Sequence, residues 1–180
     1  AGWRWCSPAS GISGTDMRLF WITAAVALGL DQLSKLGVLY GLDLLTRGDI
    51  DILPPYVNFR LQWNYGINFG LMSHGSDLAR WALIGLALAI CAWVIWWIRR
   101  ESGNRLAMLS GGMLLGGALG NVIDRAYHRA VVDFLNMSCC GIENPYSFNI
   151  ADVAIFAGAI GLVLFGGKDA KPGKPARTKR

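Results

Sequence analysis

Apolar and polar residues follow one another along the chain in long blocks. Four apolar blocks have the composition of membrane-spanning helices and cover residues 19–40, 78–98, 106–123 and 150–166. In the second block Arg80 is the only charged residue, and Arg99 and Arg100 follow it as the basic flank typical of a span that ends at a membrane surface. The pattern therefore predicts a mainly α membrane protein with four transmembrane helices.

The segment over residues 43–73 has a different pattern, in which single apolar and polar residues alternate. From Val57 to Asn64 the period is two, which indicates a β-strand with one buried face. A Pro-Pro pair before this run predicts a turn or strand start, and the glycines that follow, Gly66 and Gly70, predict tight turns. We therefore expect a small β-sheet between the first two helices, at the membrane surface.

A single membrane domain is expected over residues 17–167, with a segment of other character at each end. Residues 1–16 are small, polar and aperiodic and are set apart as an extension, whereas the basic residues 168–180 are expected to be disordered. The first apolar block resembles a signal peptide in length. No small-residue cleavage site follows it, and Asp31 and Lys35 interrupt the position where one would lie, so we expect an uncleaved helix.

Composition mainly excludes other classes of protein. The chain is 53% hydrophobic and 16% charged, and the charged share of soluble domains is roughly a quarter. The net charge of +5 does not indicate nucleic-acid binding, because much of the excess lies in residues 168–180. The cysteines show no C-x-x-C spacing, and His74 and His128 lack the spacing of metal ligands, so we expect no metal site and no cofactor.

Basic residues divide unequally between the two sides of a four-span chain. Eleven lysines and arginines fall on the side of the termini and six on the other. The positive-inside rule then places both termini in the cytoplasm. The predicted sheet and nine of the twelve acidic residues lie on the extracytoplasmic side. In a bacterium this arrangement describes a multi-pass protein of the cytoplasmic (inner) membrane.

Ionisable residues beside a bilayer core are costly and are functional candidates by default. Four aspartates lie near the outer boundary of the predicted spans: Asp31, Asp124, Asp133 and Asp152. The first two have a cation close in sequence, Lys35 and Arg125 respectively. Asp133 has Arg129 as its nearest cation in sequence, and Asp152 has no Lys or Arg between residues 130 and 167, so these two are the least charge-compensated carboxylates of the set.

Asp133 and Asp152 are therefore the candidate catalytic pair. Two carboxylates brought together cannot both ionise at low cost, so they share a proton. One can then act as general base on a water while the other protonates a substrate carbonyl, as in aspartic proteases. The alternative is structural, because an aspartate can cap a helix and Asp152 falls in the first turn of the fourth predicted helix.

Two asparagines precede aspartates by three residues. Asn121 shares a helix face with Asp124, and Asn149 shares one with Asp152. Because an amide both donates and accepts hydrogen bonds, these side chains could orient carboxylates or bind a peptide backbone. The alternative is hydrogen bonding between helices in the membrane, and the spacing leaves both interpretations open.

Five polar motifs occur in order along the chain. They are Asp31-Gln32-Leu33-Ser34-Lys35, Asn64-Tyr65-Gly66 with Phe69-Gly70, Gly120-Asn121-Val122-Ile123-Asp124-Arg125, Val131-Val132-Asp133-Phe134, and Phe148-Asn149-Ile150-Ala151-Asp152. With these motifs and the helical pattern, the chain resembles the bacterial lipoprotein signal peptidases (signal peptidase II) over about residues 17–166.

The resemblance implies an aspartyl endopeptidase that removes the signal peptide from a prolipoprotein, just before a cysteine that carries a diacylglyceryl group. It implies a lipid-modified prolipoprotein and membrane lipid as partners, a monomer, and no cofactor. The family's catalytic pair falls on Asp133 and Asp152. Its substrate-binding positions match Asn64, Gly66, Asn121, Arg125 and Asn149. Its supporting polar positions match Asp31, Lys35 and Asp124.

Two other classes of membrane protein also use aspartates. An ion-coupled transporter subunit would use them as a relay, but a relay needs polar groups through the membrane depth, and here the acids gather on one side. A metal-dependent lipid phosphotransferase would use them to bind magnesium, but no Asp-x-x-x-Asp repeat supports this. Sensitivity to a chelator would separate the phosphotransferase from a protease.

Overall fold

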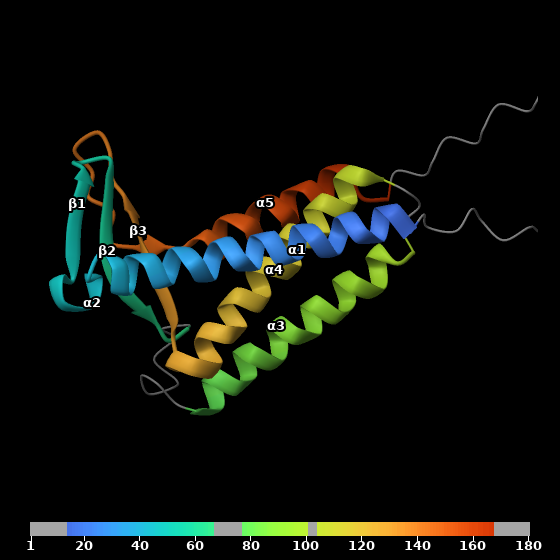
Figure 1. Cartoon of the computed structure of the whole chain (residues 1–180), viewed down its shortest axis with the longest axis horizontal. Helices are drawn as coiled ribbons and strands as arrows, with labels where there is room; N and C mark the ends of the chain where they lie inside the picture. Colours follow the sequence, from blue (N-terminus) through green and yellow to red (C-terminus); the bar gives the residue numbers. More distant parts are fainter. Residues whose placement is uncertain (1–13, 67–76, 101–103, 168–180) are drawn as a thin grey trace, which may run out of the picture.

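The computed structural model describes residues 14–66, 77–100 and 104–167. In this part of the chain four long helices form a bundle, and a small antiparallel sheet lies at one end of it (Figure 1). The helices are α1 (Gly14–Leu36), α3 (Asp77–Ile98), α4 (Arg105–His128) and α5 (Ile150–Phe165). A π-helical turn η1 (Gly37–Gly41) and a short helix α2 (Leu44–Arg47) lead from α1 to the sheet.

Each predicted span corresponds to a helix whose ends differ from the prediction. α1 begins at Gly14, so the last residues of the expected extension are helical, and α4 continues past residue 123 to His128. Among the described residues, three helices are long and apolar enough to cross a membrane: Met17–Gly41, Asp77–Ile98 and Arg105–His128. α5 is a shorter apolar helix of 16 residues. The predictions for residues 1–13, Gly70, His74 and the tail 168–180 lie outside the described residues.

The sheet is larger than predicted, because the connection between α4 and α5 also contributes to it. The described residues form strands in the order β1-β2-β3-β4: Asp49–Leu53, Val57–Asn64, Val131–Met137 and Ser147–Phe148. The strand at Val57–Asn64 is confirmed, but the expectation of a sheet confined to the segment between the first two helices was wrong. β3 lies in the interior of the sheet with Val131 to Phe134 all buried, so no period-two pattern marks it in the sequence.

Small residues let the neighbours of α4 approach it closely. A Cβ added at Gly112 would lie 2.6 Å from the carbonyl oxygen of Phe20 in α1. A Cβ at Gly158 of α5 would lie 2.6 Å from the backbone nitrogen of Leu114. Any side chain at these positions would push the helices apart. The close packing continues to the polar end of α4, where Asn121 is buried.

A second apolar cluster fixes the sheet to the bundle. Val38 of η1, Leu44 of α2 and Phe134 of β3 are buried together. Phe59 of β2 packs edge-on against Phe134, with ring centroids 5.6 Å apart. Burial of such side chains contributes about 1.5–3 kcal/mol each. The cluster therefore holds β3, and with it Asp133 next to Phe134, in a fixed place relative to the helices.

Candidate active site

Asp133 and Asp152 lie on different elements that meet where the sheet joins the bundle. Asp133 is in the middle of β3, opposite Gln62 of β2, and only 3% exposed. Asp152 lies in the first turn of α5 and is partly buried. β4 pairs with β3 and leads through Asn149 directly into α5. This one short segment therefore brings the two carboxylates to the same place.

Asn149 contacts both aspartates. Its side chain is fully buried, and its Nδ2 donates to Asp133 Oδ1 over 2.7 Å. Its Oδ1 accepts from the backbone N–H of Asp152 over 2.9 Å, and its own N–H donates to Asp152 Oδ2 over 3.3 Å. The last two bonds form a capping box at the start of α5. Asp152 thus caps the helix, as the structural alternative expected, while it also belongs to the pair.

Asn121 of α4 binds the second oxygen of Asp152. Its Nδ2 donates to Asp152 Oδ1 over 3.0 Å, and its Oδ1 accepts from Asn149 Nδ2 over 3.3 Å. These bonds link α4 to α5, as the interhelical alternative predicted for asparagines in a membrane protein. They also orient the carboxylate of Asp152, so Asn121 both links two helices and orients a carboxylate.

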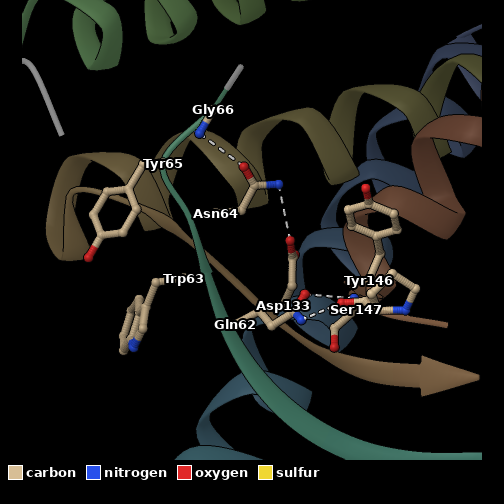
Figure 2. Close-up of a pocket in the computed structure, with 9 residues that line it drawn as sticks. Gln62, Trp63, Asn64, Tyr65, Gly66, Asp133, Tyr146 and Ser147 are labelled. Atoms are coloured by element: carbon tan, nitrogen blue, oxygen red, sulfur yellow. Dashed lines mark hydrogen bonds between the residues drawn. The ribbon is translucent and has the colours of Figure 1, made fainter. Parts of the chain in front are cut away.

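Asn64 at the end of β2 approaches the pair from the sheet. Its Nδ2 donates to Asp133 Oδ2 over 3.1 Å, and its Oδ1 accepts from the backbone N–H of Gly66 over 3.0 Å. Gly66 has a φ of +105°, a conformation that other residues rarely adopt. Figure 2 shows Asn64 between Gly66 and Asp133, with Trp63 and Tyr65 projecting to the other side of the strand. Asp133 therefore receives a side-chain amide on each oxygen.

A pocket of about 560 Å³ opens beside Asp133. Its walls come from the end of β2, from Asp133, and from the segment that precedes α5. The lining residues are Gln62, Trp63, Asn64, Tyr65, Gly66, Asp133, Pro145, Tyr146 and Ser147 (Figure 2). The wall combines aromatic rings with amide groups, and an extended peptide can use both.

The environment of Asp133 favours its protonated form. Burial, and secondly the nearby charge of Asp152, raise the pKa of Asp133 to about 6, although the bonds from Asn64 and Asn149 and the charge of Lys35 oppose the shift. A carboxyl group with such a pKa can hold a proton in the weakly acidic range and can donate it. Asp152 instead accepts hydrogen bonds at a helix N-terminus, where the helix dipole stabilises negative charge.

Asp31, Lys35 and Asp124 form a buried ion cluster next to the pair. Lys35 Nζ lies 2.7 Å from Asp31 Oδ2 and 2.7 Å from Asp124 Oδ2. The expected pairing of Asp31 with Lys35 is confirmed. For Asp124 the sequence neighbour was misleading, because adjacent residues on a helix do not face each other. Within the described part of the chain Asp124 pairs with Lys35 of α1, not with Arg125.

Arg125 lies on the side of α4 that faces the pair. Its guanidinium is within electrostatic range of Asp133 and Asp152, and its Nη1 donates to the backbone oxygen of Asn121 over 3.3 Å. Its Nε is buried and has no hydrogen-bond partner among the described residues. A buried donor of this kind is costly unless another molecule satisfies it.

Two glutamines take part in the site although the sequence assigned them no role. Gln62 Nε2 donates to the oxygen of Pro145 over 2.7 Å, and its Oε1 accepts from the N–H of Ser147 over 2.8 Å. Gln32 Nε2 donates to Asp124 Oδ1 over 3.0 Å. Their partners are more than eighty residues away in sequence, so only the position of Gln32 inside a polar motif could have indicated it.

An apolar groove of about 430 Å³ has Asp152 in its lining. Its other lining residues are Phe148, Val153, Phe156 and Ala157, so it follows the first turns of α5. Asp133 thus lines a pocket of mixed polar and aromatic residues, and Asp152 lines an apolar groove.

Known proteins match this chain over most of its length. The family described as "Signal peptidase (SPase) II" matches residues 23–166. A lipoprotein signal peptidase of Methylorubrum extorquens is 41% identical over 150 residues, which cover 83% of this chain and 86% of that protein. One of Rhodopseudomonas palustris is 41% identical over 166 residues, 90% of this chain and 97% of that protein. A bacterial membrane enzyme solved by the in meso method shares the fold, with a TM-score of 0.70 at 22% identity over 91% of this chain and 100% of its own.

Proposed function

The chain belongs to the signal peptidase II family, and we propose that Asp133 and Asp152 are the catalytic pair of its reaction. That reaction is proteolysis, the removal of the signal peptide from prolipoproteins. The observation that carries the proposal is the position of Asn149. Its buried side-chain amide donates to Asp133, which lines the mixed pocket, and its backbone N–H donates to Asp152, which lines the apolar groove.

The surroundings of the two carboxylates support different roles. Asp133 is the more buried, and its raised pKa of about 6 suits a general acid. Asp152 accepts hydrogen bonds from Asn121 and from the helix N-terminus, which suits an ionised general base. A bound peptide displaces water from the pocket and deepens the burial of Asp133, so its proton is held more firmly when substrate is present.

The reaction then proceeds without a covalent intermediate on the enzyme. Asp152 takes a proton from a water molecule, and the water oxygen forms a bond to the scissile carbonyl carbon. Asp133 gives its proton to the carbonyl oxygen, which yields a neutral diol. When the diol collapses, one of its hydroxyl protons returns to Asp133, Asp152 passes its proton to the peptide nitrogen, and the carbon–nitrogen bond breaks.

Arg125 and Asn64 are proposed to bind the substrate. The buried Nε of Arg125 lacks a partner among the described residues and lies near the pair, so a substrate carbonyl would satisfy it. Such a donor also stabilises the negative charge that develops on the carbonyl oxygen. Asn64 and Gly66 form the edge of the pocket where an extended peptide would pass.

The apolar groove is proposed to receive the diacylglyceryl group. Its walls are Phe148, Val153, Phe156 and Ala157, and it begins at Asp152. Acyl chains leave apolar lipid to enter this groove, so van der Waals packing against its apolar walls would hold them. A lipidated cysteine in this groove would place the peptide bond before it at the pair, so the substrate would be a diacylglyceryl-modified prolipoprotein.

We propose a monomeric domain over residues 17–167 that crosses the inner membrane four times. α5, with 16 residues, is about 24 Å long, and local thinning of the bilayer accommodates a helix of this length. The start of α1 and the end of α5 lie at the end of the bundle opposite the sheet, which supports termini on one side and the pair on the other (Figure 1). The positive-inside rule makes the side of the termini cytoplasmic.

The test is cleavage of a purified, diacylglyceryl-modified prolipoprotein by the purified chain in lipid. We expect cleavage that survives excess chelator, because two carboxylates activate water without a cation. Asp133→Asn and Asp152→Asn should each abolish it while folding normally, and Arg129→Met, at an exposed ion pair with Asp77, is the control. Normal cleavage by either asparagine variant would reject the pair. Loss of activity with chelator that magnesium restores would support a metal-dependent reaction instead.

A further inference from the structure

Lys35 stands at the centre of the buried ion cluster formed with Asp31 and Asp124. It comes from α1, and it bridges an aspartate of its own helix to one of α4. The three residues are 0–3% exposed. Gln32 Nε2 also donates to Asp31 Oδ2 and Asp124 Oδ1, over 3.1 Å and 3.0 Å. Buried charges need such pairing, so the cluster keeps its geometry only while all members are present.

The two aspartates of the cluster also hold the backbone beside the catalytic pair. Asp124 Oδ2 accepts from the N–H of Val132, the residue just before Asp133, over 3.1 Å. Asp31 Oδ1 accepts from the N–H of Ala151, the residue just before Asp152, over 2.9 Å. Each carboxylate that Lys35 binds is therefore one backbone amide away from a catalytic aspartate. Strand β3 and helix α5 are both tied to the same ammonium group.

We propose that Lys35 is a positioning residue for the reaction, and that its cluster with Asp31 and Asp124 sets the placement of Asp133 relative to Asp152. The inference rests on the proposed catalytic pair. A pair that shares one proton works only over a short range of separations, and a displacement of about 1 Å can cost a hundredfold in rate. Two hydrogen bonds from one rigid, buried cluster limit such displacements.

Lys35 also acts on Asp133 through its charge. The charged groups that face Asp133 are Asp152 of α5, Lys35 of α1 and Arg125 of α4. β2 contributes the neutral Asn64. Among these groups Lys35 lowers the pKa of Asp133, so its removal raises that pKa. The pair would then lose its proton at a higher pH, and the alkaline limb of the pH–activity profile would move to higher pH.

The test compares Lys35→Met, which keeps most of the length of the side chain and removes its charge, with Lys35→Arg, which keeps the charge. For folded Lys35→Met in lipid we expect kcat to fall about ten- to a hundredfold with KM little changed. The alkaline limb of kcat/KM should move to higher pH, and Lys35→Arg should return the limb toward its original position. Arg129→Met removes an exposed cation at the C-terminal end of α4, and it should change neither kcat nor the position of the alkaline limb. A residue that only stabilises the fold would lower the yield of protein but would leave the pH profile unchanged.

A second variant covers the case in which Lys35→Met leaves too much unpaired charge to fold. The triple change Asp31→Asn, Lys35→Met, Asp124→Asn removes all three charges and keeps amide oxygens for the N–H groups of Val132 and Ala151. We expect it to fold with a kcat well below that of the native chain, because the ammonium that joins the two contacts is gone. A native kcat in either folded variant would overturn the inference. Asp152→Asn is measured in the same assay. Normal cleavage by Asp152→Asn would reject the proposed catalytic pair. An inactive Asp152→Asn together with a fully active Lys35→Met would reject only the proposed role of Lys35.

Discussion

Asn149 Nδ2 lies 2.7 Å from Asp133 Oδ1, and this bond joins the start of α5 to β3, an interior strand of the sheet. The oxygen of the same amide caps α5. One residue therefore serves both the fold and the proposed chemistry, and a substitution can separate the two functions only if it keeps one of the atoms.

Asn149→Ser makes that separation. Serine is about as good a helix cap as asparagine, so its hydroxyl should still accept from the N–H of Asp152 and the cap of α5 should be kept. It has no Nδ2 to reach Asp133, so the variant loses a hydrogen bond worth about 1.5–3 kcal/mol of stability, and Asp133 loses a group that orients it. We expect kcat to fall about ten- to a hundredfold, measured on folded protein. Asn149→Ala, which also loses the cap, should be less stable than the serine variant, and a serine variant with full activity would show that the bond to Asp133 is not needed.

The two aspartates of the proposed catalytic pair should behave as one unit. Asp133→Asn and Asp152→Asn each remove one acid–base group, and such groups contribute roughly a hundred- to ten-thousandfold. The double variant should be little slower than either single variant, because the pair shares one proton and neither member works alone. The measurement is the cleavage rate of one lipidated substrate at equal amounts of folded protein.

Asp124→Asn serves as the contrasting case. It leaves Lys35 paired with Asp31 and keeps an oxygen for the N–H of Val132, so we expect part of the activity to remain. If the folded Asp124→Asn variant is inactive while Asp133→Asn still cleaves, the pair consists of Asp124 and Asp152.

Most of the polar residues that lie around Asp133 and Asp152 were proposed from the sequence, because ionisable and amide groups stand out in an apolar chain. Asp133 and Asp152 were the least charge-compensated aspartates, and in the structure the cations that act on them electrostatically come from other elements, Lys35 of α1 on Asp133 and Arg125 of α4 on both. Each of the four predicted spans also has its helix, because blocks of apolar residues are strong signals.

Contacts between segments that are far apart in the sequence could not be predicted from local patterns. The N–H of Ala151 bonds to Asp31 across 120 residues, and no local pattern encodes that bond. β3 was missed because its residues are buried on both faces of the sheet, so apolar and polar residues do not alternate along it. The partner of Asp124 was missed for a related reason, since Lys35 lies on another helix whereas the cations nearest in sequence point elsewhere.

The stability of the protein should depend on the protonation of Asp133. The pKa of this carboxyl is raised from 3.8 to about 6 in the folded state, so folding favours the protonated form. Its contribution is fully present below about pH 4 and is lost as pH rises through about 6, at a cost of about 3 kcal/mol at most. We expect the Tm of the native chain to fall over this range relative to that of Asp133→Asn, which lacks the group. Parallel Tm curves for the two proteins would contradict the raised pKa.

The orientation in the membrane can be tested with reporters that are active on one side only. The distribution of basic residues predicts that a reporter fused after Ser73 is extracytoplasmic and one fused after Gly103 is cytoplasmic. The two fusions control each other, because both contain the first span and differ by the second. The reverse result would place the aspartate pair on the cytoplasmic face, where it could not meet a translocated prolipoprotein.

The apolar groove beside Asp152 should determine how tightly the lipidated substrate binds. Ala157→Trp places a large ring in the groove, whereas Val163→Trp adds the same ring to a position on α5 that is 83% exposed and outside the groove. If the ring removes about 1.4 kcal/mol of the packing that holds an acyl chain in the groove, KM should rise about tenfold. The aspartates remain in place, so kcat should change little. We expect the native KM for Val163→Trp, measured on the same diacylglyceryl-modified prolipoprotein. An equal rise in KM for both variants would mean that the ring acts through the surrounding lipid, and no rise for Ala157→Trp would mean that the acyl chains bind elsewhere on the bundle.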